Sequence, residues 1–177
     1  MYPESKKTSD EKLVVDFVGY SEPNNGRELW QVDVSHNNSS INDKLFPSGW
    51  NYINFRIEKW QLESLGFAYI PAEGTAKLLN LDTSEIHNLQ YKGVSTTSFI
   101  GNIFGFGKLM EVYFDLIQIT DLSTFNTTTI DWKNTEFIEW AEFLNEGEIK
   151  LTLAKVEDGV RKKRSTTMAI VNTGFGS

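Results

Sequence analysis

Residues 148–170, which read EIKLTLAKVEDGVRKKRSTTMAI, carry the clearest structural signal in the sequence. Apolar and polar side chains alternate through the first half, which is typical of a β-strand with one buried face. Asp158-Gly159 follows, and this residue pair is favoured in tight hairpin turns because both central positions need a positive φ. The pattern therefore predicts a hairpin whose return strand runs through residues 166–170.

The return strand opens with the cationic run Arg-Lys-Lys-Arg at residues 161–164. The whole chain, however, holds 17 basic and 24 acidic residues, a net charge of −7. Binding to nucleic acid depends on cationic neutralisation of phosphate, so we expect no nucleic-acid partner. Charged side chains also keep an edge strand from pairing with other chains. We therefore expect this strand to start at a sheet edge, with its cations solvated or paired with acids on neighbouring strands.

Alternating patterns recur outward from this hairpin, and no regular helices lie between them. A chain of this kind is not a doubly wound α/β protein, and it is typical of antiparallel sheets. The clearest other alternating stretches are residues 13–18, 30–35, 51–62 and 109–119.

Residues 135–145 are the exception to the alternation. Phe137, Trp140, Ala141 and Leu144 fall at i, i+3, i+4 and i+7, the spacing of one helix face. We therefore predict an α+β fold that is mainly antiparallel β. It would be a sandwich or a partly closed barrel of seven or more strands, with one packed helix near 135–145.

The length of 177 residues suits one domain, and we find no internal repeat or low-complexity linker. We predict a single domain over residues 1–177, with a loose N-terminal arm at 1–11 and a flexible tail at 172–177. Cysteine is absent, which excludes disulfides, thiolate metal sites and a cysteine nucleophile. The polar N-terminus lacks the apolar segment of a secretory signal, and charges interrupt the longest apolar stretch. We expect a cytoplasmic protein without a membrane partner.

Residues 101–108, GNIFGFGK, invite a phosphate-loop interpretation that their spacing does not support. The motif needs a glycine where Asn102 stands and a Ser or Thr where Leu109 stands. We interpret this segment as a flexible apolar loop that enters a strand. Its Phe104 and Phe106 are candidates for exposed contacts with a partner.

The two histidines, His36 and His87, share no ligand spacing and lie in polar sequence, so we predict that both are surface residues. No catalytic, metal or nucleotide motif stands out along the chain. We therefore predict no cofactor, no metal site and no catalytic set.

Acidic residues form two candidate sites. Glu111, Tyr113 and Asp115 share one face of the predicted strand 109–119, with Cα atoms of the two acids about 13 Å apart. Glycosidase carboxylates lie roughly 5–9.5 Å apart, so a neighbour such as Glu58 would have to close the gap. These four residues are the candidates for lining a ligand site.

The second candidate site is an acidic stripe on the predicted helix, formed by Glu136, Glu139 and Glu142. Such a stripe is either a solvated helix face or a recognition surface for a basic partner.

The sequence favours a non-catalytic protein–protein interaction domain. Its most specific form would be an acidic neutraliser of a basic protein partner, as in a toxin–immunity pair, an analogy of charge and size alone. Three alternatives remain open: a small-molecule or carbohydrate-binding β-barrel, a structural subunit of a β-rich assembly, and a carboxylate-based hydrolase. The oligomeric state is not determined by the sequence.

Overall fold

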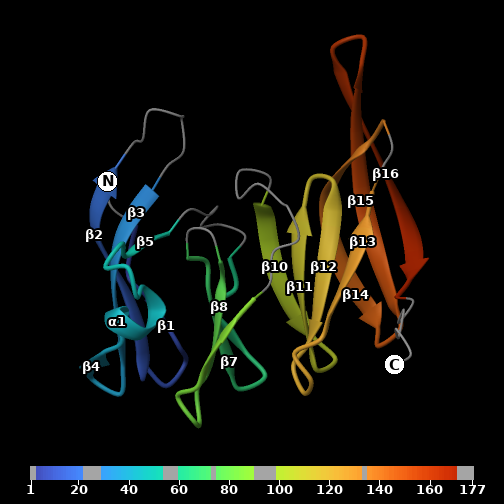
Figure 1. The fold of residues 1–177 in the computed structure, drawn as a ribbon. Helices are drawn as coiled ribbons and strands as arrows, with labels where there is room; N and C mark the ends of the chain where they lie inside the picture. Colours follow the sequence, from blue (N-terminus) through green and yellow to red (C-terminus); the bar gives the residue numbers. More distant parts are fainter. Residues whose placement is uncertain are drawn as a thin grey trace. The chain divides into compact units, whose positions relative to one another are not determined.

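A computed structural model describes residues 3–21, 29–53, 60–72, 75–89, 99–132 and 135–170. These residues form sixteen β-strands and one four-residue helix, α1 (Asn42–Leu45) (Figure 1). All the strand pairings among them are antiparallel, which confirms the predicted fold class. The chain divides into two compact units, residues 1–55 with 61–97 and residues 56–60 with 98–177. The single-domain assignment stays a prediction.

The first unit contains two antiparallel sheets. One has the order β1-β2-β3-β4, with β5 also paired to β3, and the other has the order β6-β7-β8-β9. Its strands are β1 (Lys6–Lys7), β2 (Leu13–Ser21), β3 (Leu29–His36), β4 (Ser39–Ser40), β5 (Tyr52–Ile53), β6 (Glu63–Ser64), β7 (Phe67–Ile70), β8 (Lys77–Asn80) and β9 (Ile86–Asn88). Alternating buried side chains of β2 and β3 form part of its core: Leu13, Val15, Val32 and Val34.

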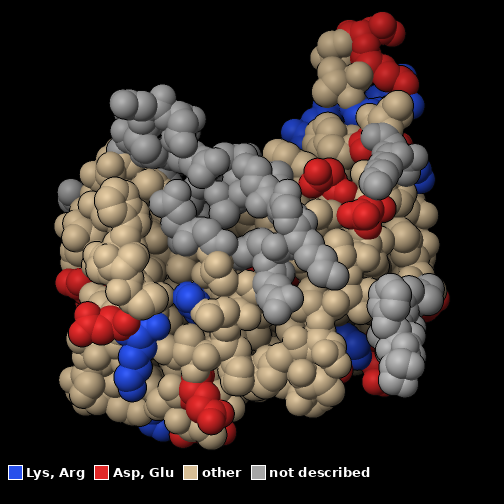
Figure 2. Space-filling view, in the orientation of Figure 1, with Lys and Arg blue, Asp and Glu red and all other residues tan. Residues whose placement is uncertain are grey.

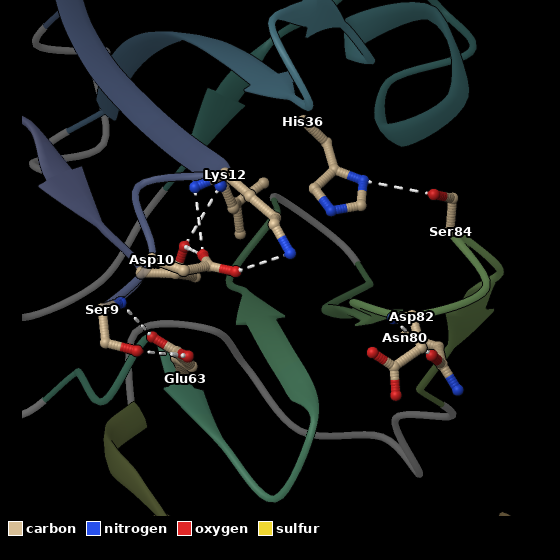
Figure 3. Close-up of polar contacts among 10 residues, drawn as sticks. Ser9, Asp10, Lys12, His36, Glu63, Asn80, Asp82 and Ser84 are labelled. Carbon is tan, nitrogen blue, oxygen red and sulfur yellow. Dashed lines mark hydrogen bonds and ion pairs between the residues drawn. The ribbon is translucent and has the colours of Figure 1, made fainter.

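The prediction that residues 1–11 form a loose arm is wrong for residues 3–11, the part of this segment that the structure describes. β1 pairs with β2, and the buried Thr8 accepts a backbone hydrogen bond from Leu13 through its side-chain oxygen. The Glu63 carboxylate of β6 accepts two hydrogen bonds from Ser9 (Figure 3). This segment is thus tied to both sheets of the unit, whereas the predicted tail at 172–177 lies outside the described residues.

The second unit is a sandwich of two antiparallel sheets, with the orders β10-β11-β12-β13 and β14-β15-β16 (Figure 1). Apolar side chains from both sheets make one buried cluster, which includes Met110 and Ile117 from the first sheet and Leu151 from the second. The strands are β10 (Phe99–Gly105), β11 (Lys108–Tyr113), β12 (Leu116–Asp121), β13 (Thr127–Asp131), β14 (Phe137–Asn145), β15 (Glu148–Glu157) and β16 (Val160–Ala169).

The helix predicted near 135–145 is wrong, because these residues form strand β14. Its pairing with β15 shifts register at Glu139, where one extra residue bulges out of the strand. Ile138 and Ala141 are therefore three residues apart and yet both lie opposite buried leucines of β15. A bulge reverses the side-chain alternation, so a bulged strand can imitate the spacing of a helix face.

Two further segments differ from their predicted forms. The predicted strand 109–119 is a hairpin, in which β11 and β12 turn at residues 114–115. The predicted loop at 101–108 is the end of strand β10 and a second hairpin, which turns at Phe106-Gly107. Both of these corrections add strands to the same sheet.

Two-residue turns with positive φ at both positions close four hairpins of the described chain. The predicted turn at Asp158-Gly159 is confirmed, with φ values of 51° and 76°. Positive φ at both central residues defines a type I′ turn, whose twist matches that of the flanking strands. The other three turns are Asn37-Asn38, Leu65-Gly66 and Phe106-Gly107.

Candidate protein-interaction surface

The hairpin of β15 and β16 is long and regular. Ten residue pairs run without a register shift from Glu148↔Ala169 to Glu157↔Val160. Its turn end projects past the ends of β10–β13 (Figure 1), where Val156 and Val160 are 65% and 58% exposed. In the described chain, β16 pairs with β15 alone and stands at the end of its sheet. The predicted edge position of this strand is confirmed.

The turn determines which backbone groups face outward from β16. A two-residue turn makes the flanking residues, Glu157 and Val160, a hydrogen-bonded pair, and hydrogen-bonded pairs then alternate along the hairpin. The backbone groups of the even-numbered residues 160–168 therefore face β15. The bond from the amide of Ile170 to the carbonyl of Gly147, 2.7 Å long, continues the same alternation. The N–H and C=O groups of the odd-numbered residues 161–169 consequently point away from the sheet.

The cations at the start of β16 are paired with carboxylates of the same unit. Glu139 Oε1 lies 2.6 Å from a guanidinium nitrogen of Arg161 and 2.9 Å from Lys163 Nζ. The Arg161 guanidinium also lies 5.4 Å from the centre of the Phe137 ring, within cation–π range. Because Glu139 is the bulged residue of β14, its side chain can reach across β15 to the edge strand. The predicted pairing of this run with acids is confirmed.

Two more carboxylates pair with cations of the hairpin. Glu136 Oε1 accepts a 2.7 Å hydrogen bond from Arg164 Nε, which lowers the pKa of Glu136 below its ordinary value. Glu157 accepts from Lys155 and, at 2.8 Å, from Lys162, and these hydrogen bonds lower the pKa of Glu157. Figure 2 shows the result, with acidic side chains at the projecting tip and basic ones just below it. The side chains of Glu157, Lys155 and Lys162 are exposed at 41%, 38% and 58%, so the two ion pairs of Glu157 stabilise the fold only slightly.

The predicted acidic stripe is therefore a row of ion pairs on a strand. Glu142 Oε1 lies 2.7 Å from Nζ of Lys150, which is directly opposite it on β15. Each of the three glutamates of the stripe thus has a cation from β15 or β16. The acids and the cations can each be recognised in the sequence. Which acid pairs with which cation depends on the register between β14, β15 and β16, and this register cannot be predicted when residues 135–145 are interpreted as a helix.

The two predicted aromatic contact residues differ in exposure. Phe106 is 53% exposed at the tip of its hairpin, where its ring stands edge-on to that of Phe143. Phe104 is 8% exposed, so its predicted exposure is wrong. Because the segment is a strand, Phe104 points to a buried face of the sheet instead of lying in a loop.

The predicted ligand-lining residues do not all come together. Glu111 is buried at 1% exposure and accepts a hydrogen bond of 3.3 Å from the Tyr113 hydroxyl, also buried. Asp115 is exposed in the turn between β11 and β12, so it does not share a surface with Glu111. Glu58 lies outside the described residues. A glycosidase-like pair of Glu111 and Asp115 is therefore not formed.

Glu111 belongs to a polar row for which the sequence has no local signature. Asn102, Glu111, Gln118 and Thr129 stand directly opposite one another across β10–β13. The first three are 2%, 1% and 0% exposed, on the face of the sheet opposite the sandwich core. A slip of one residue would turn these side chains into that core, so the row helps to fix the register.

A histidine and a serine meet in the first unit. His36 is buried at 3% exposure, so its predicted surface position is wrong, while His87 is half-buried on β9. His36 Nδ1 lies 3.2 Å from Ser84 Oγ, and Ser84 has a φ of 60° in the turn before β9 (Figure 3). A serine and a histidine alone, without an acid to orient the ring, do not make a catalytic triad. We interpret this contact as a link between the two sheets.

The described residues contain no group of three or more His, Asp or Glu side chains placed to hold a metal ion. The one helix of the described residues has four residues and is too short to cross a membrane.

No family model matches the sequence, and no curated protein sequence matches it. Fold and surface together therefore define a class, an antiparallel β-sandwich unit with a free, charge-paired edge strand.

Proposed function

We propose that this chain is a non-catalytic protein-interaction domain, and that its partner adds a β-strand to the free edge of β16. One observation carries the proposal: a ten-residue edge whose odd-numbered backbone groups point outward and whose side chains are mostly exposed. Strand addition of this kind takes its affinity from main-chain hydrogen bonds, and side chains give it specificity.

The charge pairing of the surface supports this mode of binding. A basic partner docking on Glu136, Glu139 and Glu142 would have to compete with the cations that these carboxylates already hold. A strand at the edge of β16 would leave all of these ion pairs in place. The acidic neutraliser of a basic partner accordingly stays a prediction from the sequence, as do the structural subunit of a β-rich assembly and the carboxylate-based hydrolase. Binding of a small molecule or carbohydrate also stays a prediction, but the second unit is a sandwich and not a closed barrel.

A selection of extended peptides against the whole immobilised chain tests the proposal, with binding mapped by amide hydrogen exchange. We expect selected peptides to slow exchange at residues 161, 163, 165 and 167. Selected peptides that protect another surface, or a monomeric chain for which the selection yields no peptide, would contradict it.

Ser165→Pro and Ser165→Ala are a matched pair for this experiment. Proline removes the outward N–H of residue 165 without removing a hydrogen bond to β15, and edge strands tolerate proline at such positions. Alanine removes the same hydroxyl but keeps the N–H. We expect peptide affinity to fall at least tenfold in the proline variant, a loss of roughly 1.4 kcal/mol, and to change little in the alanine variant.

A further inference from the structure

The edge of β16 lacks most of the devices that keep sheet edges from pairing. Proteins protect edges with short strands, proline, bulges and charged side chains. Strand β16 is ten residues long, contains no proline and pairs with β15 without a register shift. β14, the opposite edge of the same sheet, has two such shifts. Charge is the remaining protection of β16, and it is confined to residues 161–164.

Charge divides β16 into two halves. The first half carries Arg161, Lys162, Lys163 and Arg164, and the second half, residues 165–169, is the uncharged sequence Ser-Thr-Thr-Met-Ala. A parallel, in-register partner of the same sequence would place cation against cation. An antiparallel one centred on Ser165 places Arg161 opposite Ala169 and Lys163 opposite Thr167.

We infer that the strand added to β16 is β16 of a second copy of this chain, antiparallel and centred on Ser165. This inference rests on the proposed function. On the other face, the same register places Lys162 opposite Met168 and Arg164 opposite Thr166, so no cation faces a cation. Ser165 is an odd-numbered position, so the central pair of the two copies exchanges both backbone hydrogen bonds. Two three-stranded sheets would thereby become one sheet of six strands.

The ion pairs favour a second copy over an acidic strand from another protein. All four cations of the run already have a carboxylate of their own chain, at 2.5 to 2.9 Å. An acidic partner strand would bring more carboxylates to Glu136 and Glu139, whereas a second copy brings an uncharged half-strand to each cationic half.

Sedimentation velocity of the whole chain over a wide concentration range tests the inference. We expect a reversible monomer–dimer equilibrium for the wild type and for Ser165→Ala, and a monomer for Ser165→Pro. A wild type that stays monomeric, or a proline variant that dimerises like the wild type, would overturn it.

Charge substitution at Thr167 gives a second test that needs no proline. In the proposed register Thr167 faces Lys163 of the second copy, twice in each dimer. We expect Thr167→Glu to strengthen dimerisation and Thr167→Lys to weaken it, each on the order of fivefold. Thr167→Glu raises the net negative charge of each copy, which by itself would increase repulsion, so a stronger dimer reports the local pairing. Equal or reversed effects would rule out this register.

The two proposals can fail separately. The wild type could be monomeric while selected peptides still protect the odd-numbered amides of β16. This result would support the proposed interaction domain and would rule out pairing between two copies. A monomeric wild type without such peptides would reject both.

Discussion

Gly105 marks a close approach between the two sheets of the second unit. A Cβ atom at this position would lie 2.8 Å from a ring carbon of Phe143, too close for two carbon atoms. Phe143 packs against the buried cluster of the sandwich, so moving its ring aside would disturb these contacts. The absence of a side chain at residue 105 therefore lets strand β10 lie against this part of β14.

We expect Gly105→Ala to lower the free energy of unfolding by about 1–3 kcal/mol, the usual cost of overpacking. Gly147→Ala is the control, because its Cβ would have no heavy atom closer than 3.8 Å. Urea unfolding at unchanged m-value measures both. A Gly105→Ala variant as stable as Gly147→Ala would show that the ring moves aside freely.

Asp10 holds the turn between β1 and β2, and its protonation should affect stability. The backbone N–H of Lys12 and the Thr8 hydroxyl donate to its carboxylate and lower the pKa of Asp10 to about 2. A carboxyl whose pKa is lower in the folded state stabilises that state above its unfolded pKa, near 3.8, and loses this contribution as the pH falls toward about 2.

We therefore expect the difference in stability between wild type and Asp10→Asn to shrink as the pH falls from 3.8 to about 2. Urea midpoints measured at several pH values across this window provide the test. A difference that stays constant with pH would mean that the carboxylate charge does not matter in this turn.

The four type I′ turns differ in how well their residues tolerate the positive φ that this turn requires. Asp158-Gly159 has favoured residues, whereas Leu65 takes a φ of 56° at the first central position of its turn. A residue with a Cβ loses roughly 1–2 kcal/mol in this left-handed conformation, and asparagine tolerates it best. Leu65 is 51% exposed, so it gains little from burial in return.

We expect Leu65→Asn to raise the free energy of unfolding by about 1 kcal/mol. Leu144→Asn is the matched control, because Leu144 is similarly exposed at 46% but has no positive φ. Thermal or urea unfolding compares the two variants. A destabilised Leu65→Asn variant would show that the leucine side chain has a packing role that outweighs its backbone strain.

At the element scale, the sequence predicted strands well where alternation was unbroken. The β15–β16 hairpin could be recognised because its register has no shift from Glu148 to Ala169. The strand at 137–145 could not, because its bulge at Glu139 produces a helical spacing. The turn at residues 114–115 was also hidden, since the alternation of apolar residues continues through it at Val112, Phe114 and Leu116.

The candidate site was predictable in part for the same reason. The cationic run and its edge position follow from the hairpin pattern, and both are confirmed. The acids that pair with the run were visible in the sequence, but their contacts required the fold of β14. The polar row of Glu111 and Gln118 joins residues of neighbouring strands and has no local signature.

At the scale of the whole molecule, the chain forms two compact units, each with antiparallel sheets of its own. Buried apolar side chains occur in both, from β2 and β3 in the first unit and from both sheets of the sandwich in the second. Two such units unfold either together or one after the other.

We expect one cooperative unfolding transition, in keeping with the predicted single domain. Tryptophan fluorescence and far-ultraviolet circular dichroism should give coincident curves, which is the usual test of two-state behaviour. Two separated transitions would instead identify the units as independently stable domains.

The central claim is that β16 has a free edge available for pairing, and amide hydrogen exchange resolved by residue tests it most directly. In dilute protein we expect slow exchange at residues 162, 164, 166 and 168 and fast exchange at residues 161, 163, 165 and 167. At high concentration, the second group should become slow as well. Exchange without this alternation, or outward amides that stay fast at every concentration and with every selected peptide, would contradict the claim.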